Sequence, residues 1–338
     1  MPKNYYLNLL IVGELNRDFI IDLSGKPTND LPGGSLLNAA AGARVWSENI
    51  GLVSRIGDDF PSEWIDAFEK RGFDTRGIWL LPQNFDVRRF YFWQDPNHCI
   101  TDSPVASYSH SGLPFPHNLL GYSSVFTEAT EKMWRNITPH LNPTFPPEFL
   151  DSHAVHICPI NLISQIKLTA FFQHASINTI TVSPSDDYMN PGYFEQLPAV
   201  IKGITAFFPS ELQLGTLFQG RAKDVWEMAE GLAEAGCPLT VIQRGEKGYW
   251  MYDAANRLKF SLPFYPTRWL NPTGINDVFA GAFLGEYKKN YDPIHALLAG
   301  AATASVAVEG VGPFYCLDGF PDIASARREV LASMLKRI

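Results

Sequence analysis

A turn that leads into a long helix is the most informative stretch of this 338-residue sequence: Asn271-Pro-Thr-Gly-Ile-Asn-Asp-Val-Phe-Ala-Gly-Ala-Phe283. Asn-Pro-Thr-Gly is typical of a turn, and the small and apolar residues after it predict a helix over Gly274–Lys289. Asp277 falls in its first turn, where unpaired N–H groups and the positive end of the helix dipole can bind phosphate. A carboxylate there can accept a proton from a hydroxyl that attacks the phosphate. It can equally be an acid that stabilises a helix N-terminus, so the rest of the chain must decide.

Short apolar runs alternate with helical segments along most of the chain. Buried strands are expected at Leu7–Gly13, Ile50–Ile56, Ala154–Cys158, Thr179–Ser183, Thr205–Phe208 and Leu239–Gln243. Further helices are expected at Leu36–Glu48, Pro61–Arg71, Leu162–His174, Ser210–Phe218, Lys223–Ala235, Pro293–Val308 and Pro321–Lys336. This alternation predicts one α/β domain over residues 1–338, with a mostly parallel sheet covered by helices on both faces.

The charge balance argues against two classes of partner. The chain has 27 Lys and Arg against 35 Asp and Glu, a net charge of −8, and no block of basic residues. Nucleic acids and anionic membrane surfaces require clustered positive charge, so we expect neither as a partner. No uninterrupted apolar stretch reaches the length of about 18 residues that would predict a transmembrane helix.

The cysteines and the first residues favour a cytoplasmic protein. Cys99, Cys158, Cys237 and Cys316 are widely spaced, so they form neither a CxxC pair nor a disulfide-rich pattern. The first 13 residues are too short and too polar for a signal peptide. We therefore expect free thiols in a reducing compartment.

The middle of the chain departs from the regular alternation. Residues 94–147 contain 8 of the 25 prolines and four of the eight histidines, which predicts an ordered insertion with long loops. These histidines lack the spacing of a metal site. The His153-x-x-His156 pair lies in or beside a strand, not on a helix with a Glu. We therefore assign no metal ligand.

Two interpretations of this insertion stay open. Its aromatic side chains could wall an acceptor pocket by stacking on a ring, or the segment could be a packed surface excursion that contacts a partner subunit. The side chains concerned are Trp93, Tyr108, Phe115, His117 and Tyr122. Arg88 and Arg89 face opposite sides of the expected strand Val87–Trp93. One of them could bind a phosphate or carboxylate of the substrate, or form a salt bridge that faces solvent.

Several motifs, in the right order along essentially the whole chain, resemble the ribokinase-like (PfkB) carbohydrate kinase family. Besides the segment around Asp277, they are Gly13-Glu-Leu-Asn16-Arg-Asp18, Gly33-Gly34-x-x-x-Asn38, Ile56-Gly57-Asp58-Asp59, Gln243-Arg-Gly245-Glu-Lys-Gly248 and Gly310-Val-Gly312. The resemblance implies a ribokinase-like three-layer α/β/α domain with a mostly parallel central sheet and a small β-sheet lid. It implies lid strands at about 14–34 and 85–105, and a lid that covers the sugar and excludes water.

The resemblance also implies a role for each matching position. Asp277 matches the catalytic base. Three residues match the anion hole: Gly274, Ile275 and Asn276. The positions that hold sugar hydroxyls, for which short polar side chains are suited, are Asn16, Asp18, Gly33, Gly34 and Asn38. The positions on the nucleotide side are Ser210, Gln213, Gln243 and Gly245.

The implied activity is ATP-dependent phosphorylation of a primary hydroxyl on a sugar or sugar-like molecule, with ATP and Mg²⁺ as cofactors. A nucleoside kinase of the same fold is the alternative. The lid often pairs with a second subunit in this family, so the resemblance allows a homodimer through the lid. The acceptor itself stays unnamed, because one set of hydroxyl-binding positions serves substrates of many shapes.

Three positions depart from the family's pattern. Asn276 stands where the anion-hole motif has a second Gly, and Gln213 stands where an Asn-x-x-Glu motif has the Glu that helps to organise Mg²⁺ and phosphate. Ser210 and Gln213 equally fit a helix capping box. Asn271 replaces an Asp that in relatives often lies near a monovalent cation, which disfavours K⁺. These changes keep open a second hypothesis, a catalytically weak relative that binds a sugar or a nucleotide.

Overall fold

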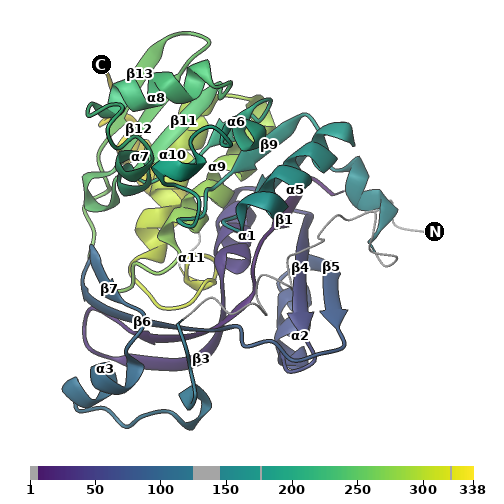
Figure 1. Ribbon diagram of the computed structural model, residues 1–338, viewed down its shortest axis with the longest axis vertical. Helices are drawn as coiled ribbons and strands as arrows, with labels where there is room; N and C mark the ends of the chain where they lie inside the picture. The colour runs from purple at the N-terminus through teal and green to yellow at the C-terminus, as the bar shows by residue number, and fades with distance from the viewer. Residues whose placement is uncertain (1–6, 125–144, 176, 320–321) are drawn as a thin grey trace.

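The computed structural model describes residues 7–124, 145–175, 177–319 and 322–338, and they form two sheets (Figure 1). The strands of the larger sheet are β1 (Leu9–Val12), β4 (Ile50–Gly57), β5 (Phe73–Leu81), β8 (Ala154–Ile157), β9 (Thr179–Val182), β10 (Ala206–Phe207), β11 (Leu239–Gln243), β12 (Tyr249–Asp253), β13 (Leu258–Leu262) and β14 (Lys336–Arg337). Their order is β14-β13-β12-β11-β10-β9-β8-β1-β4-β5. The pairs from β11 to β5 are parallel and those from β11 to β14 are antiparallel, so the expected mostly parallel sheet is confirmed.

β1 lies in the interior of this sheet because its residues are apolar on both faces. All four of its side chains are buried. Leu9 is in register with Ile50 of β4 on one side and with Ala154 of β8 on the other. A strand enclosed in this way has no polar face to offer to water, as the continuous apolar run predicted.

Helices cover both faces of the larger sheet. They are α1 (Ser35–Trp46), α2 (Ser62–Lys70), α5 (Leu162–His174), α6 (Pro198–Ile201), α7 (Glu211–Leu217), α8 (Val225–Glu234), α9 (Ile275–Asn290), α10 (Pro293–Ala307), α11 (Tyr315–Asp318) and α12 (Ile323–Ala332). Two neighbours in β11 show the layering. Val241 is buried in a cluster with Phe279 of α9, whereas Ile242 is buried in a cluster with Leu232 of α8. The three layers α/β/α follow from this alternation.

The helices α1 and α9 pack unusually closely, because glycines face backbone atoms across the contact. An added Cβ at Gly42 of α1 would overlap the carbonyl oxygen of Val278, and one at Gly281 of α9 would overlap the carbonyl oxygen of Ala39. Small side chains therefore let the two backbones touch. The first turns of both helices consequently lie beside each other at the carboxyl end of the sheet.

The smaller sheet is built from two segments that are far apart in the sequence (Figure 1). Its strands are β2 (Asn16–Ile21), β3 (Pro27–Gly33), β6 (Arg88–Asp95) and β7 (His98–Ile100), in the order β3-β2-β6-β7. β2 and β6 are parallel, with Asp18 opposite Arg89 and Phe19 opposite Phe90. The first pair and the second pair therefore lie on opposite faces of the small sheet.

The described part of the Pro- and His-rich insertion covers one face of the small sheet. Its helix α3 (Pro104–His110) and the short 3₁₀ helix η1 (His117–Leu119) bring Tyr108 and Leu119 into a buried cluster with Phe19 and Phe90. The Tyr108 ring lies 5.8 Å from that of Phe90. Phe115 and Tyr122 pack against the same cluster, so for these residues the structure favours the second of the two open interpretations, a packed excursion. Residues 125–144 of the insertion lie outside the described residues.

The C-terminal segment differs from expectation. A helix was expected over Pro321–Lys336, but α12 ends at Ala332 and Lys336 pairs with Ser261 of β13. Polar residues with helical spacing fit an exposed edge strand equally well, so spacing could not separate the two. No helix in the described ranges is long and apolar enough to cross a membrane.

Candidate active site

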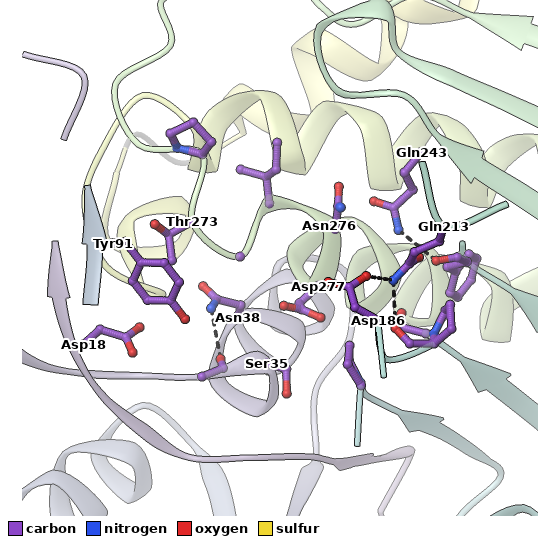
Figure 2. A pocket seen from close by; sticks show the side chains of 18 of the residues that line it. Asp18, Ser35, Asn38, Tyr91, Asp186, Gln213, Gln243, Thr273, Asn276 and Asp277 are labelled. Carbon is purple, nitrogen blue, oxygen red and sulfur yellow. Dashed lines mark hydrogen bonds between the residues drawn. The ribbon is translucent and has the colours of Figure 1, made fainter. Parts of the chain in front are cut away.

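A cavity of about 390 Å³ opens where the carboxyl ends of the central strands, the small sheet and the first turn of α9 meet (Figure 2). In parallel α/β sheets this edge is where ligands bind, because loops from several strands converge there. Its lining residues are Asp18, Gly34, Ser35, Asn38, Tyr91, Trp93, Pro159, Ser183, Pro184, Asp186, Phe208, Gln213, Gln243, Pro272, Thr273, Gly274, Ile275, Asn276 and Asp277.

The first turn of α9 lies in the middle of the cavity, between Asp18 on one side and Gln213 and Gln243 on the other (Figure 2). Gly274 is its N-cap, with a left-handed φ of 73°, and an added Cβ would overlap the side chain of Asn38. Only glycine fits this position, since it meets both the backbone and the space requirement. Asn276 follows inside the helix with an ordinary φ, so the Asn in place of the family's Gly causes no backbone strain.

Asp277 sits in this first turn and lines the cavity. Removal of its carboxyl group from water raises its pKa from 3.8 to about 7. A carboxylate with a pKa near neutrality can hold and release a proton under physiological conditions. The unpaired N–H groups of the helix end beside it can receive an anion.

Asp18 lies at one end of the cavity, on the small sheet (Figure 2). It is 3% exposed, and its Oδ1 has no hydrogen-bond partner within the described part of the chain. Burial raises its pKa to about 7, against the opposing effects of Arg89 and the Gly34 N–H. A buried carboxylate oxygen without a partner is costly unless a ligand donates to it. Asn38 lies nearby and donates through Nδ2 to the Gly34 carbonyl oxygen at 2.9 Å.

Arg88 and Arg89 face opposite sides of β6, as alternation predicted. Arg88 pairs with Asp86 at 2.7 Å and donates to the carbonyl oxygens of Asn118 and Leu120, in the insertion. Arg89 lies on the cavity face, 3.7 Å from Glu14 Oε2. Its charge lowers the pKa of Glu14, which burial nevertheless raises to about 7. Both arginines thus form ion pairs within the chain.

Two aromatic residues follow Arg89 along the cavity face of β6. Tyr91 and Trp93 both line the cavity, and the Trp93 Nε1–H donates to Thr273 Oγ1 at 2.8 Å. This bond joins the small sheet to the turn that begins α9. A second link joins the residue Leu23, after β2, to the same turn: its N–H donates to the Leu270 carbonyl oxygen at 3.0 Å.

The nucleotide-side residues are distributed over two loops and a helix N-terminus. Ser210 and Gln213 form the expected capping box of α7, and Gln213 also reaches the cavity. Gln243, at the end of β11, is 3% exposed and lines the cavity. Its Oε1 accepts no hydrogen bond from any described residue. Gly245 begins the short 3₁₀ helix η5 (Gly245–Lys247), with a left-handed φ of 56°.

The structure brings most of the residues expected at the site to one cavity. Those that line it are Asp277, Gly274, Ile275, Asn276, Asp18, Gly34, Asn38, Gln213 and Gln243. Four others do not: Asn16, Gly33, Ser210 and Gly245. Asn16 and Gly33 are paired across β2 and β3, and a Cβ at Gly33 would overlap the Asp18 carboxylate, so the absence of a side chain at Gly33 leaves room for Asp18.

Sequence reasoning missed several lining residues. Tyr91 could have been found, because it lies two residues from Arg89 on one strand face. Asp186 could not, since it belongs to a loop after β9 and reaches the cavity through a contact with Gln213.

His156, one of the histidines considered for a metal, is buried and bonded to the Thr181 hydroxyl at 2.9 Å.

This arrangement defines a class of enzyme. A half-buried acid at a helix N-terminus, a cavity at the carboxyl edge of a parallel sheet and a small sheet across the opening suit phosphoryl transfer to a small-molecule hydroxyl. The protein is a phosphotransferase with an alcohol acceptor.

Comparisons with known proteins agree with this class. Residues 158–318 match the pfkB family carbohydrate kinases. Over 290 residues the chain is 29% identical to a cytidine kinase of Thermococcus kodakarensis, covering 84% of this chain and 89% of that protein. A ribokinase II of E. coli in complex with ATP and Mg²⁺ shares 18% identity with a TM-score of 0.70, over 96% of this chain and 99% of that one. A nucleoside kinase of Methanocaldococcus jannaschii shares 20% identity with a TM-score of 0.69, over the same shares of both chains.

Residues 158–318 thus resemble the pfkB family of carbohydrate kinases, and the chain has the ribokinase fold. The resemblance and the fold expected from the motifs are thereby confirmed.

Proposed function

We propose that this protein is an ATP-dependent kinase that phosphorylates a primary hydroxyl of a nucleoside or a related sugar-like molecule. The observation that carries the proposal is the placement of Asp277 at the α9 N-terminus, across one cavity from Asp18 and Asn38. The first can take a proton, and the other two can hold hydroxyls. The nucleoside acceptor is supported by the relatives described as cytidine and nucleoside kinases, and by the aromatic walls Tyr91 and Trp93.

In this mechanism the acceptor is held at the lid end of the cavity. The unpartnered Asp18 Oδ1 accepts a hydrogen bond from a sugar hydroxyl, and Asn38 offers a second polar contact. Their hold fixes the orientation of the acceptor, so that its primary hydroxyl reaches Asp277. Closure of the lid through Trp93 and Thr273 excludes water and so limits hydrolysis of the phosphoryl donor.

Asp277 then accepts the proton as the hydroxyl oxygen attacks. The N–H groups at the start of α9 stabilise the negative charge that develops on the transferred group. ATP supplies the phosphoryl group when bound, and Mg²⁺ offsets the charge of its phosphates. Gln243 and Asn276 support such a fit, because the first has a buried, unpartnered oxygen and the second is an exposed donor on the first turn of the helix.

K⁺ is not expected to be required. Asn271 is 3% exposed, and its Oδ1 accepts from the Thr273 N–H at 3.2 Å. Its side chain therefore closes the turn before α9, and it carries no charge that could attract a cation.

The test is a phosphoryl-transfer screen over nucleosides, sugars and polyols with ATP and Mg²⁺, in which product mass identifies the acceptor. Cytidine and ribose belong in the panel, and Asp277→Ala serves as the control for contaminating kinases. We expect one nucleoside or sugar to gain a single phosphoryl group with the wild type only. Equal product from Asp277→Ala would remove the proposed base, and no product from any acceptor would reject the kinase.

A second candidate is a binding protein that has lost most of its activity. The observation in its favour is Gln213, a neutral side chain where the family has Glu. It predicts tight binding of nucleotide without turnover. Measuring both ADP affinity and product formation on the same preparation separates the two candidates.

A further inference from the structure

The side-chain amide of Gln213 is held by hydrogen bonds within the protein and offers no charge to a metal ion. Its Oε1 accepts from the Ser210 N–H at 2.8 Å, and its Nε2 donates to Asp186 Oδ1 at 2.7 Å and to the Pro184 carbonyl oxygen at 3.3 Å. The backbone N–H must face the amide oxygen and the carboxylate must face the amide nitrogen, so the network determines the orientation of the side chain. Both ends of the amide are therefore occupied within the protein.

The carboxylate that this amide holds belongs to Asp186, a residue in the loop after β9. Asp186 is exposed and lines the cavity beside Gln213 (Figure 2). No salt bridge between described residues involves it, and Gln213, its hydrogen-bond donor, is neutral. A full negative charge thus stands, without a cation, at the end of the cavity where phosphates are expected.

Such a charge repels phosphates unless a cation lies between them. Mg²⁺ is suited to this place, because it prefers carboxylate oxygens and keeps several of its waters. A second oxygen on the same wall, Gln243 Oε1, is buried and has no donor among the residues that the structure describes. Amide oxygens can accept from water molecules of a hydrated ion.

We propose that Asp186 supplies the carboxylate through which this chain holds hydrated Mg²⁺ at the nucleotide phosphates, and that Gln213 positions it. The inference rests on the proposed kinase function. In this chain the negative charge that the family pattern has at position 213 is supplied by Asp186, in the loop after β9. Gln213 is neutral and orients the Asp186 carboxylate through a hydrogen bond. A Gln at position 213 is then compatible with a functional Mg²⁺ site, because Asp186 supplies the carboxylate.

The first experiment measures metal dependence without catalysis. ADP affinity is determined by calorimetry at increasing Mg²⁺ for the wild type, Asp186→Asn and Asp187→Asn. Asp187 is the matched control, since it is the next residue, is equally exposed and does not line this cavity. We expect Asp186→Asn to raise the Mg²⁺ concentration at half-effect by about tenfold or more, with Asp187→Asn close to the wild type. Equal behaviour of the two variants would overturn the inference.

The second experiment moves the charge. Gln213→Glu alone puts two like charges side by side and removes the amide donor, so we expect no gain in Mg²⁺-dependent ADP affinity. The double variant Asp186→Asn with Gln213→Glu restores one carboxylate and one amide, and we expect it to recover most of what Asp186→Asn lost. A large gain from Gln213→Glu alone would assign the site to position 213 and overturn the proposal.

These outcomes keep the inference separate from the function on which it rests. If the wild type binds ADP in a Mg²⁺-dependent way and Asp186→Asn leaves this unchanged, the inference about Asp186 fails and the kinase proposal stands. If the wild type binds no nucleotide at any Mg²⁺ concentration, both are rejected.

Discussion

Two carboxylates that line the cavity, Asp18 on the lid and Asp277 at the start of α9, lie in different surroundings. At the lid end, burial raises the pKa of Asp18 to about 7 while Arg89 and the Gly34 N–H act against the increase. At the start of α9, burial alone raises the pKa of Asp277 to about 7. A carboxylate next to a cation and a fixed donor is suited to hold hydroxyls, and one without such partners is suited to take a proton. The two carboxylates therefore differ in their partners and also in exposure, since Asp18 is buried and Asp277 is half-buried.

The largest effect is expected from Asp277→Asn. The amide keeps the size of the side chain but cannot accept the proton, so we expect kcat to fall by about 10²–10⁴-fold while ADP affinity is retained. Steady-state kinetics and calorimetry measure the two quantities. Asp292→Asn is the control, because Asp292 caps the neighbouring helix α10 outside the cavity and Asn can cap equally well. A similar fall in that control would show that any acid at a helix N-terminus matters.

Asp18→Asn should affect acceptor binding instead. Loss of a charged acceptor of hydrogen bonds is expected to raise the acceptor KM by about 10- to 100-fold and to leave ADP affinity unchanged. The control is Asp30→Asn on the same small sheet, where Asp30 pairs with Arg17 and does not line the cavity. If Asp18→Asn lowered kcat as much as Asp277→Asn does, the contrast between the two carboxylates would not hold.

The pH dependence should separate activity from stability. Ionised Asp277 is the active form, so we expect kcat/KM to fall about tenfold per pH unit below about pH 7. Stability should change in the opposite direction. Between pH 4 and 7 the folded Asp18, Asp277 and Glu14 hold protons that the unfolded chain has released, so stability is lost as the pH rises through this window.

Asp277→Asn tests that linkage directly. The variant avoids the buried charge, so we expect it to be more stable than the wild type by about 1–3 kcal/mol at pH 8 and equal to it near pH 4. Urea unfolding at the two pH values measures the difference. A stability gain that is the same at both pH values would mean that ionisation is not its cause.

The smallest effect concerns the bond that connects the small sheet to the turn before α9. Trp93→Phe keeps a ring in the cavity wall but removes the N–H that donates to Thr273, and we expect a two- to tenfold loss in kcat/KM, about the value of one hydrogen bond. Thr273→Val removes the same bond from the other side. The double variant should lose no more than either single one, and additive losses would mean that the two residues act separately.

Some residues of the cavity could be predicted from the sequence and others could not. The residues after β1, the glycines before α1 and the start of α9 could be predicted, because each lies within a few positions of a recognisable element. Asp186 could not, since spacing along the chain does not reveal which loop contacts Gln213 across the sheet edge. The aromatic residues of the insertion were recognised as a group, but alternation alone could not say on which face of the small sheet Tyr108 would pack.

Helices α3 and η1 of the insertion cover one face of the small sheet, and this affects how the enzyme should behave on dilution. A homodimer through the lid stays a prediction, yet Tyr108 and Leu119 already bury Phe19 and Phe90 within one chain. A second subunit is then not needed to keep this face away from water. We therefore expect specific activity to be constant from micromolar to nanomolar protein, so that the amount of product formed depends on the number of chains and not on how often they meet.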